Sequence, residues 1–227
     1  MPVKILYEDN HLIVAVKPAG VLSQADGGPK EDMLSLLKDD VKVRYDKPGD
    51  VYLGLVHRLD QNVGGVMVFA RTSKAAARLS AAIRDHAFEK RYLALVEGEI
   101  PEGTRGRLVD RLAKDEGTRK AVVDGAGGRE AVLEYESLAV VRREGRVRTL
   151  VDVRLESGRF HQIRAQFAHA GHPLVGDTKY GGTPAGRGVL GLHAFELAFA
   201  HPVTGAPMVF RDVPKQVPFD RLDIPVK

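Results

Sequence analysis

The sequence of 227 residues contains no cysteine. This absence excludes disulfide bonds, thiolate metal sites and cysteine nucleophiles, and it is typical of proteins that work in a reducing compartment. The chain also lacks an apolar signal segment near its first residue and any run approaching the ~20 apolar residues that span a bilayer. We therefore expect a cytoplasmic protein that does not enter a membrane.

Charge of one sign is only slightly in excess. The 34 Lys and Arg residues against 30 Asp and Glu residues give a formal net charge of +4. Such a balance is compatible with a polyanionic partner such as nucleic acid, although many proteins that bind none share it. Hydrophobic residues make up 44% of the chain, enough to bury a core within one domain.

The chain has no internal repeat and no low-complexity tract. Gly and Pro cluster at 18–29, 101–106, 125–128 and 181–188, which predicts turns there. Short apolar runs between the turns predict strands at 12–16, 52–56, 66–70, 92–96, 132–135 and 150–155. Because regular helices do not separate these runs, the pattern favours an α+β fold. The charged stretch 105–129 fits no element clearly.

Two segments have helical spacing. Thr72 and Ser73 are good N-cap residues for a helix in which Ala76, Leu79 and Ile83 form an apolar stripe. A second helix is expected to begin near His161, because Ile163, Phe167 and Ala170 recur at i, i+4 and i+7. Gly171 is expected to end it.

Four segments concentrate unusual residues, namely 16–20, 56–60, 89–92 and 158–164. Each has an ordinary structural explanation. Lys17-Pro18 is typical of a turn, and Asp60 before two glycines is typical of an Asx-turn or a cap. Tyr92 within an apolar run is compatible with a packed aromatic, and Arg164 with an exposed helical arginine.

Together and in this order, the four segments resemble the RluA family of RNA pseudouridine synthases. The resemblance runs over residues 5–214, with His57-Arg58-Leu59-Asp60 and 158–164 at its centre, followed by 168–177 and Tyr180-Gly181. The chain departs from the family pattern after Asp60, where Gln-Asn-Val-Gly-Gly replaces the more typical Lys-Asp-Thr-Ser-Gly. Phe160 replaces a usual Thr. Since the pattern begins at Ile5, we expect no N-terminal S4-type RNA-binding domain.

The resemblance implies the fold and the chemistry. We expect one pseudouridine synthase catalytic domain over residues 1–227, built on a mixed, largely antiparallel central sheet flanked by helices and loops. Asp60 is the expected catalytic carboxylate, acting near C1′ of a uridine flipped out of ribosomal or transfer RNA. Tyr92 would stack on the uracil and relay a proton, and Arg164 would keep Asp60 ionised. Substrate and product are isomers, so we expect no metal, organic cofactor or obligatory protein partner.

Other residues of the same segments are expected to bind RNA or to support the site. Arg58 and His57 are placed to enter the space that a flipped base vacates, although a salt bridge shaping the loop is an alternative for Arg58. Basic side chains are expected to extend a phosphate-binding surface at Arg71, Lys90 and Arg91, although a solvated helix face is an alternative for Arg71. Support of the pocket or its loops is expected from Lys17, Leu59, His161, Gln162 and Ile163.

Two other functions remain open at this point. His161, His169 and His172 form a His-rich segment that could suggest a metal-dependent hydrolase, but no neighbouring carboxylate completes a known ligand pattern. A second alternative is an RNA-binding module without catalysis. The simultaneous presence of Asp60, Tyr92 and Arg164 argues against that alternative.

Overall fold

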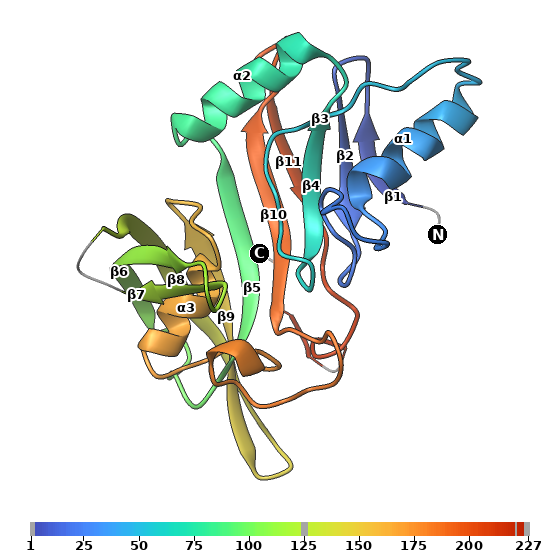
Figure 1. The fold of residues 1–227 in the computed structure, drawn as a ribbon. Helices are drawn as coiled ribbons and strands as arrows, with labels where there is room; N and C mark the ends of the chain where they lie inside the picture. The colour runs from blue at the N-terminus through green and yellow to red at the C-terminus, as the bar shows by residue number, and fades with distance from the viewer. Residues whose placement is uncertain (1–2, 124–126, 221, 225–227) are drawn as a thin grey trace. The chain divides into compact units, whose positions relative to one another are not determined.

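The computed structural model describes residues 3–123, 127–220 and 222–224. The chain divides into two compact units, one of Met1–Glu89 with Ala194–Asp212 and one of Lys90–His193 with Val213–Lys227. Figure 1 traces the chain and labels its helices and strands. The expected single catalytic domain over 1–227 stays a prediction.

The first unit is a sheet with two helices. Its strands follow the order β1-β2-β4-β10, with β3 paired to β4 and β11 paired to β10. The elements are β1 (Lys4–Glu8), β2 (Leu12–Lys17), α1 (Met33–Arg44), β3 (Gly54–Leu55), β4 (Gly64–Ala70), α2 (Ser73–Arg84), β10 (Leu192–Ala200) and β11 (Pro207–Arg211). The strand expected at 52–56 is therefore shorter than predicted.

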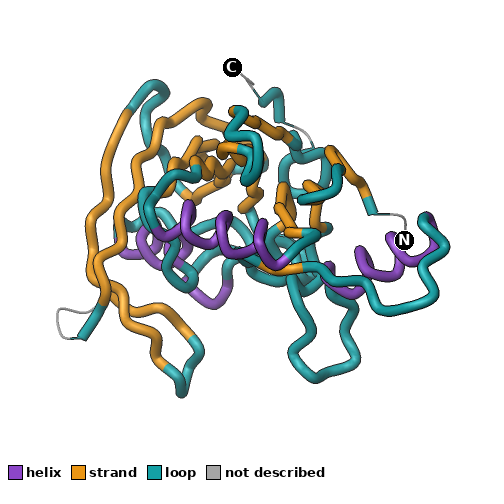
Figure 2. Tube along the Cα trace, turned by 90° about the horizontal axis from the view of Figure 1, so that it is seen from above, coloured by secondary structure: helices purple, strands orange, loops and turns teal. Residues whose placement is uncertain are grey.

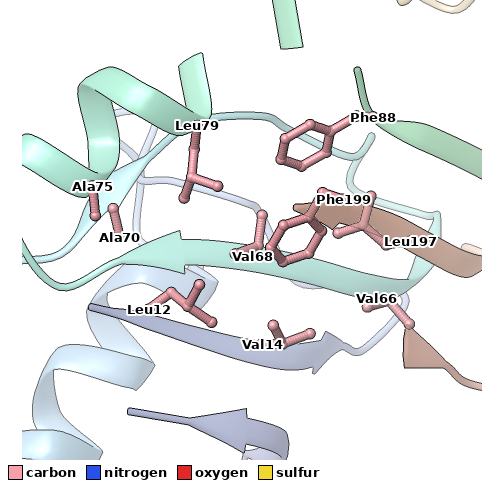
Figure 3. Packing of buried hydrophobic residues seen from close by; sticks show 10 residues of the cluster. All are labelled: Leu12, Val14, Val66, Val68, Ala70, Ala75, Leu79, Phe88, Leu197 and Phe199. Carbon is pink, nitrogen blue, oxygen red and sulfur yellow. The ribbon is translucent and has the colours of Figure 1, made fainter. Parts of the chain in front are cut away.

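The helix α2 covers this sheet through its apolar stripe. Figure 3 shows Ala75 and Leu79 directed toward Val68 and Ala70 of β4, all of them buried. The ring of Phe88, which follows α2, stacks on Phe199 of β10 with centroids 4.8 Å apart. Thr72 caps the helix, since its side chain accepts a hydrogen bond from the N–H of Ala75 at 3.1 Å. The sequence prediction of this helix is confirmed.

The helix α1 was not predicted from the sequence. Asp32 caps it by accepting a hydrogen bond from the N–H of Ser35 at 3.0 Å. Its buried residues Met33, Leu37 and Val41 recur every four positions. The cap and the spacing are both visible in the sequence, but charged residues between them dilute the apolar pattern.

The second unit is a sheet of antiparallel strands in the order β5-β9-β8-β6-β7. The strands are β5 (Glu89–Glu97), β6 (Arg105–Asp115), β7 (Lys120–Val123), β8 (Arg129–Arg143) and β9 (Arg146–Leu155), accompanied by α3 (Gln162–His169) and the short helix η1 (Thr178–Tyr180). The stretch 105–129, unassigned from sequence, thus forms β6, β7 and the start of β8. Of the turn expected at 125–128, residues 125 and 126 lie outside the described residues.

The α+β class is confirmed, with antiparallel pairing between the strands whose register is described. Figure 2 shows that strands and loops account for most of the trace, with the helices as separate segments. Within the part of the chain that the structure describes, no helix is both long and apolar enough to cross a membrane.

Candidate active site

Asp60 lies in the turn between β3 and β4, where its carbonyl accepts a hydrogen bond from the N–H of Val63 at 3.1 Å. The preceding residue, Leu59, is buried and is held at both backbone groups by one side chain. The Ser23 hydroxyl donates to the Leu59 carbonyl at 2.7 Å and accepts from the Leu59 N–H at 3.0 Å. The backbone leading into Asp60 is therefore fixed by a residue far away in the sequence.

The residue after Asp60 is held as firmly. The Gln61 carbonyl accepts from the N–H of Gly20 at 2.8 Å and from Lys17 Nζ at 3.0 Å. The Gln61 side-chain amide donates to the Gly20 carbonyl at 2.9 Å. Sequence reasoning missed both Ser23 and Gln61. For Gln61 a signal was available, because it replaces a lysine that is more typical of the family pattern.

Lys17 is fully buried at the end of β2. Its Nζ donates to the carbonyls of Pro18 at 3.1 Å, Val21 at 2.6 Å and Gln61 at 3.0 Å. These acceptors match the three N–H donors of an ammonium group. Burial lowers the pKa of Lys17 to about 7, while the Asp60 carboxylate acts in the opposite direction. Lys17 thus connects the 18–21 turn to the Asp60 turn, a position that suits the expected support role.

The basic residues expected to bind RNA from this unit have different surroundings. Arg58 is exposed, two residues before Asp60. His57 accepts a hydrogen bond from the N–H of Val68 at its Nε2, at 3.1 Å, so this ring is held against β4. The guanidinium of Arg71 pairs with Glu8 at 2.9 Å and donates to the Asp9 carbonyl at 2.6 Å. It is therefore engaged within its own unit.

In the second unit, the adjacent residues Arg91 and Tyr92 project their side chains from opposite faces of the sheet. Tyr92 pairs with Val153, which pairs with Tyr135, and the Tyr135 ring meets Phe167 of α3 edge-on at 5.4 Å. Side chains in one such row share a face of the sheet, so Tyr92 projects from the face that α3 covers. Arg91 projects from the opposite face.

On that opposite face Arg91 forms an ion pair with Asp152. Both belong to a pocket of about 580 Å³ whose lining also includes Arg105, Arg107 and Glu134. Arg107 pairs in turn with Glu156, and Arg105 with Glu136. Since its arginines have carboxylate partners, this charged surface is largely self-neutralising.

Lys90 lies two positions before Tyr92 in β5, so its side chain shares the Tyr92 face. Its Nζ approaches Gly158, where a Cβ atom would lie 3.8 Å away. Burial lowers the pKa of Lys90. Lys90 is thus a partly desolvated cation beside the loop that leads into α3.

Arg164 lies in the first turn of α3 and is oriented by Asp177. Its Nε and Nη2 donate to the two Asp177 carboxylate oxygens at 2.6 and 2.8 Å. The Asp177 side chain is almost completely buried. Arg164 also lies over the ring of Tyr180, with Cζ 5.1 Å from the centroid. Asp177 belongs to the segment 168–177 that resembles the family pattern, but no role was predicted for it from the sequence.

The remaining predicted residues of this segment lie at the start of α3. Gln162 is buried, donates to the Val132 carbonyl at 3.1 Å and accepts from the Ser157 hydroxyl and the Arg159 N–H. Ile163 is buried beside it. His161 takes the N-cap position, which agrees with the expected helix start, and its Nδ1 lies 2.8 Å from the Tyr180 hydroxyl.

The structure offers no support for the metal-hydrolase alternative. Among residues 3–123, 127–220 and 222–224, no group of three or more His, Asp or Glu side chains is arranged to hold a metal ion. His172 instead lies with Nδ1 3.0 Å from the Glu97 carbonyl.

A family model described as RNA pseudouridylate synthase matches residues 11–169. The ribosomal large subunit pseudouridine synthase D of Zymomonas mobilis is 33% identical, over 97% of this chain and 69% of that protein. The tRNA pseudouridine synthase C of Yersinia pestis is 33% identical, over 89% of this chain and 82% of that protein.

The fold is shared with a solved structure of human RNA Pseudouridylate Synthase Domain Containing 1. The TM-score is 0.74 at 22% identity, covering 94% of this chain and 84% of that one. The chain spans between 65% and 69% of the length of three relatives that are named ribosomal large subunit pseudouridine synthase D.

Proposed function

Because the chain belongs to the RNA pseudouridylate synthase family, we propose that it converts specific uridines of ribosomal or transfer RNA to pseudouridine. One observation carries the proposal. Asp60, the carboxylate that the family resemblance singles out, stands between Leu59 and Gln61, whose backbone groups are held by Ser23, Gly20 and Lys17. A catalytic group needs such a fixed position, whereas a surface Asx-turn does not.

The reaction breaks the C1′–N1 bond, turns the uracil and joins C1′ to C5. The C5 proton is then lost and a proton is gained at N1, so the product is an isomer of the substrate. Asp60 acts as nucleophile or electrostatic partner at the sugar. The proposed reaction uses no metal ion and no organic cofactor.

Tyr92 and Arg164 complete the proposed catalytic set. Tyr92 offers a flat ring to the flipped uracil and a hydroxyl for proton transfer. Arg164 contributes a positive charge to the proposed catalytic set. Its pairing with Asp177 supports this role, because the guanidinium is held in one orientation before the substrate arrives.

RNA binding in this proposal rests chiefly on Arg58 and Lys90. Arg58 is exposed beside Asp60, where its guanidinium plane can stack in the gap left by the flipped base. Lys90, lying on the Tyr92 face, can meet a phosphate. Arg71 and Arg91 add positive charge but are ion-paired with Glu8 and Asp152. We also propose that the protein acts in the cytoplasm, without an obligatory protein partner.

The test uses ribosomal and transfer RNA transcribed in vitro with uridine tritiated at C5. Pseudouridine formation releases this tritium to water, and sequencing after chemical derivatisation then locates the product. We expect release from one RNA pool, at defined positions, and equal rates with and without a chelator.

The alternatives give different results in the same experiment. RNA binding without tritium release from either pool would support the non-catalytic binding module. Activity abolished by the chelator and restored by a metal ion would refute the cofactor-free mechanism.

A further inference from the structure

Phe160 is an exposed aromatic residue at the loop before α3, with 40% of its surface accessible. It stands where the family pattern more typically has Thr, so it is a feature of this chain. Its ring stacks on the neighbouring His161, with centroids 3.8 Å apart and planes 19° from parallel. The two consecutive side chains thus form a stack of two rings, in which one face of Phe160 lies against His161.

The His161 side chain of this stack is held in place by its backbone conformation and by contacts with Tyr180. His161 adopts the left-handed backbone conformation, with φ of 50° and ψ of 26°, which non-glycine residues rarely adopt. Its Nδ1 lies 2.8 Å from the Tyr180 hydroxyl, and that hydroxyl accepts the N–H of Ala121 at 2.6 Å. The Tyr180 ring meets the His161 ring edge-on at 5.6 Å. The side chains that support the Phe160 ring are therefore already ordered. A ligand that stacks on this ring would restrict little further side-chain motion.

Two lysines lie close to the rings of Phe160 and Tyr180. Lys114 Nζ lies 5.5 Å from the Phe160 centroid, and Lys120 Nζ lies 5.9 Å from the Tyr180 centroid. Lys114 pairs with Glu116, but both side chains are exposed, so the pair is weak and readily exchanged.

The cations also repel one another. The pKa of Lys179 is lowered by burial first and then by the positive charges of Arg164, Lys120 and Arg119, with Asp177 opposing them. This excess of positive charge favours a polyanion.

We propose that Phe160 and His161 form a stacking platform for an RNA base flanking the modified uridine, with Lys114 and Lys120 contacting the adjacent phosphates. Aromatic rings flanked by cations are the means by which proteins hold unpaired bases. The platform is continuous with the proposed active site, because Tyr180 contacts His161 on one side and the Arg164 guanidinium on the other. The inference rests on the proposed function for the identity of the flanked uridine.

The first test compares Phe160→Leu with Phe160→Trp. Leucine keeps an apolar side chain but loses the flat ring, and tryptophan keeps the ring. We expect Phe160→Leu to weaken binding of an RNA stem-loop containing the target uridine by roughly 5- to 150-fold at one fixed salt concentration. Phe160→Trp should bind like the wild type. Tyr52→Leu is the matched control, since Tyr52 is also an exposed aromatic residue, with 52% of its surface accessible.

The second test is a thermodynamic cycle with abasic RNA. Each base near the target uridine is removed in turn, and the affinities of wild type and Phe160→Leu are measured. We expect one position at which base removal weakens the wild type but leaves Phe160→Leu unchanged. Full additivity at every position, or equal affinities of Phe160→Leu and wild type, would overturn the platform.

Both tests read binding, so they remain informative if no uridine is converted. In that case the abasic scan covers the whole RNA fragment that the protein binds. A cycle that shows coupling without any tritium release would retain the platform and refute the enzymatic proposal. Tritium release without coupling would do the reverse.

Discussion

Arg164 and Asp177 are joined by two parallel hydrogen bonds, from Nε at 2.6 Å and from Nη2 at 2.8 Å. The residues lie 13 positions apart, one in the first turn of α3 and one just before η1. Only 12% of the Arg164 side chain and 1% of the Asp177 side chain are exposed. The pair is therefore a desolvated bidentate contact that sets the direction of the guanidinium.

Removing the carboxylate from this pair should be costly. Asp177→Asn removes the carboxylate to which the largely buried Arg164 guanidinium donates, which costs about 3–5 kcal/mol of unfolding free energy. The matched control is Glu156→Gln, since Arg107 and Glu156 form the same two-bond geometry on the surface. That exposed pair should contribute less than about 1 kcal/mol. Urea unfolding of the three proteins measures both, and equal losses would contradict the argument from burial.

Asp60→Asn separates the catalytic role from the turn role. Asparagine has nearly the same size and serves an Asx-turn equally well, but it lacks the negative charge. We expect the melting temperature and RNA affinity to be retained and pseudouridine formation to fall by several orders of magnitude. Near-normal turnover in a well-folded variant would show that Asp60 is not the catalytic carboxylate.

Lys17 should make stability depend on pH in an unusual direction. Its folded-state pKa is lowered to about 7, whereas in the unfolded chain it stays near ~10.4. Between these values the unfolded chain binds more protons, so the free energy of unfolding should rise with pH. The limiting slope for one group is about 1.4 kcal/mol per pH unit.

The measurement is denaturant unfolding at pH 7, 8 and 9 for wild type and Lys17→Met, which has a similar length and no charge. The difference between the two proteins should shift in favour of the wild type as pH rises. A pH-independent difference would mean that the carbonyls of Pro18, Val21 and Gln61 keep the ammonium charged throughout.

Gly65 should tolerate no side chain. Its φ is 128°, and a Cβ would lie 2.1 Å from the carbonyl oxygen of Ala194, a backbone atom that cannot move aside cheaply. Gly103 also has a positive φ, of 78°, but open space around it. Gly103→Ala should therefore cost only the backbone strain of about 1–2 kcal/mol. Gly65→Ala should cost about 1–3 kcal/mol more, and equal unfolding free energies would exclude the clash.

Local patterns in the sequence determined several elements of this protein. The helix α2 follows from the Thr72 cap and the spacing of its apolar residues, both of which act within a few positions. The strands β2, β4 and β5 contain unbroken apolar runs that need burial in a sheet. The segments around Asp60 and Arg164 likewise carry their family pattern in consecutive residues. Information of this kind is readable because the interacting positions are close along the chain.

Only the tertiary structure decided which groups hold these segments in place. Nothing near Leu59 in the sequence indicates Ser23, which lies 36 positions away, and nothing near Arg71 indicates its ion pair with Glu8. The strand β6 escaped prediction because its charged residues interrupt the apolar pattern, whereas its pairing with β8 depends on the fold. A contact between distant positions depends on which strands pair and in what register. The local pattern of polar and apolar residues does not specify that pairing.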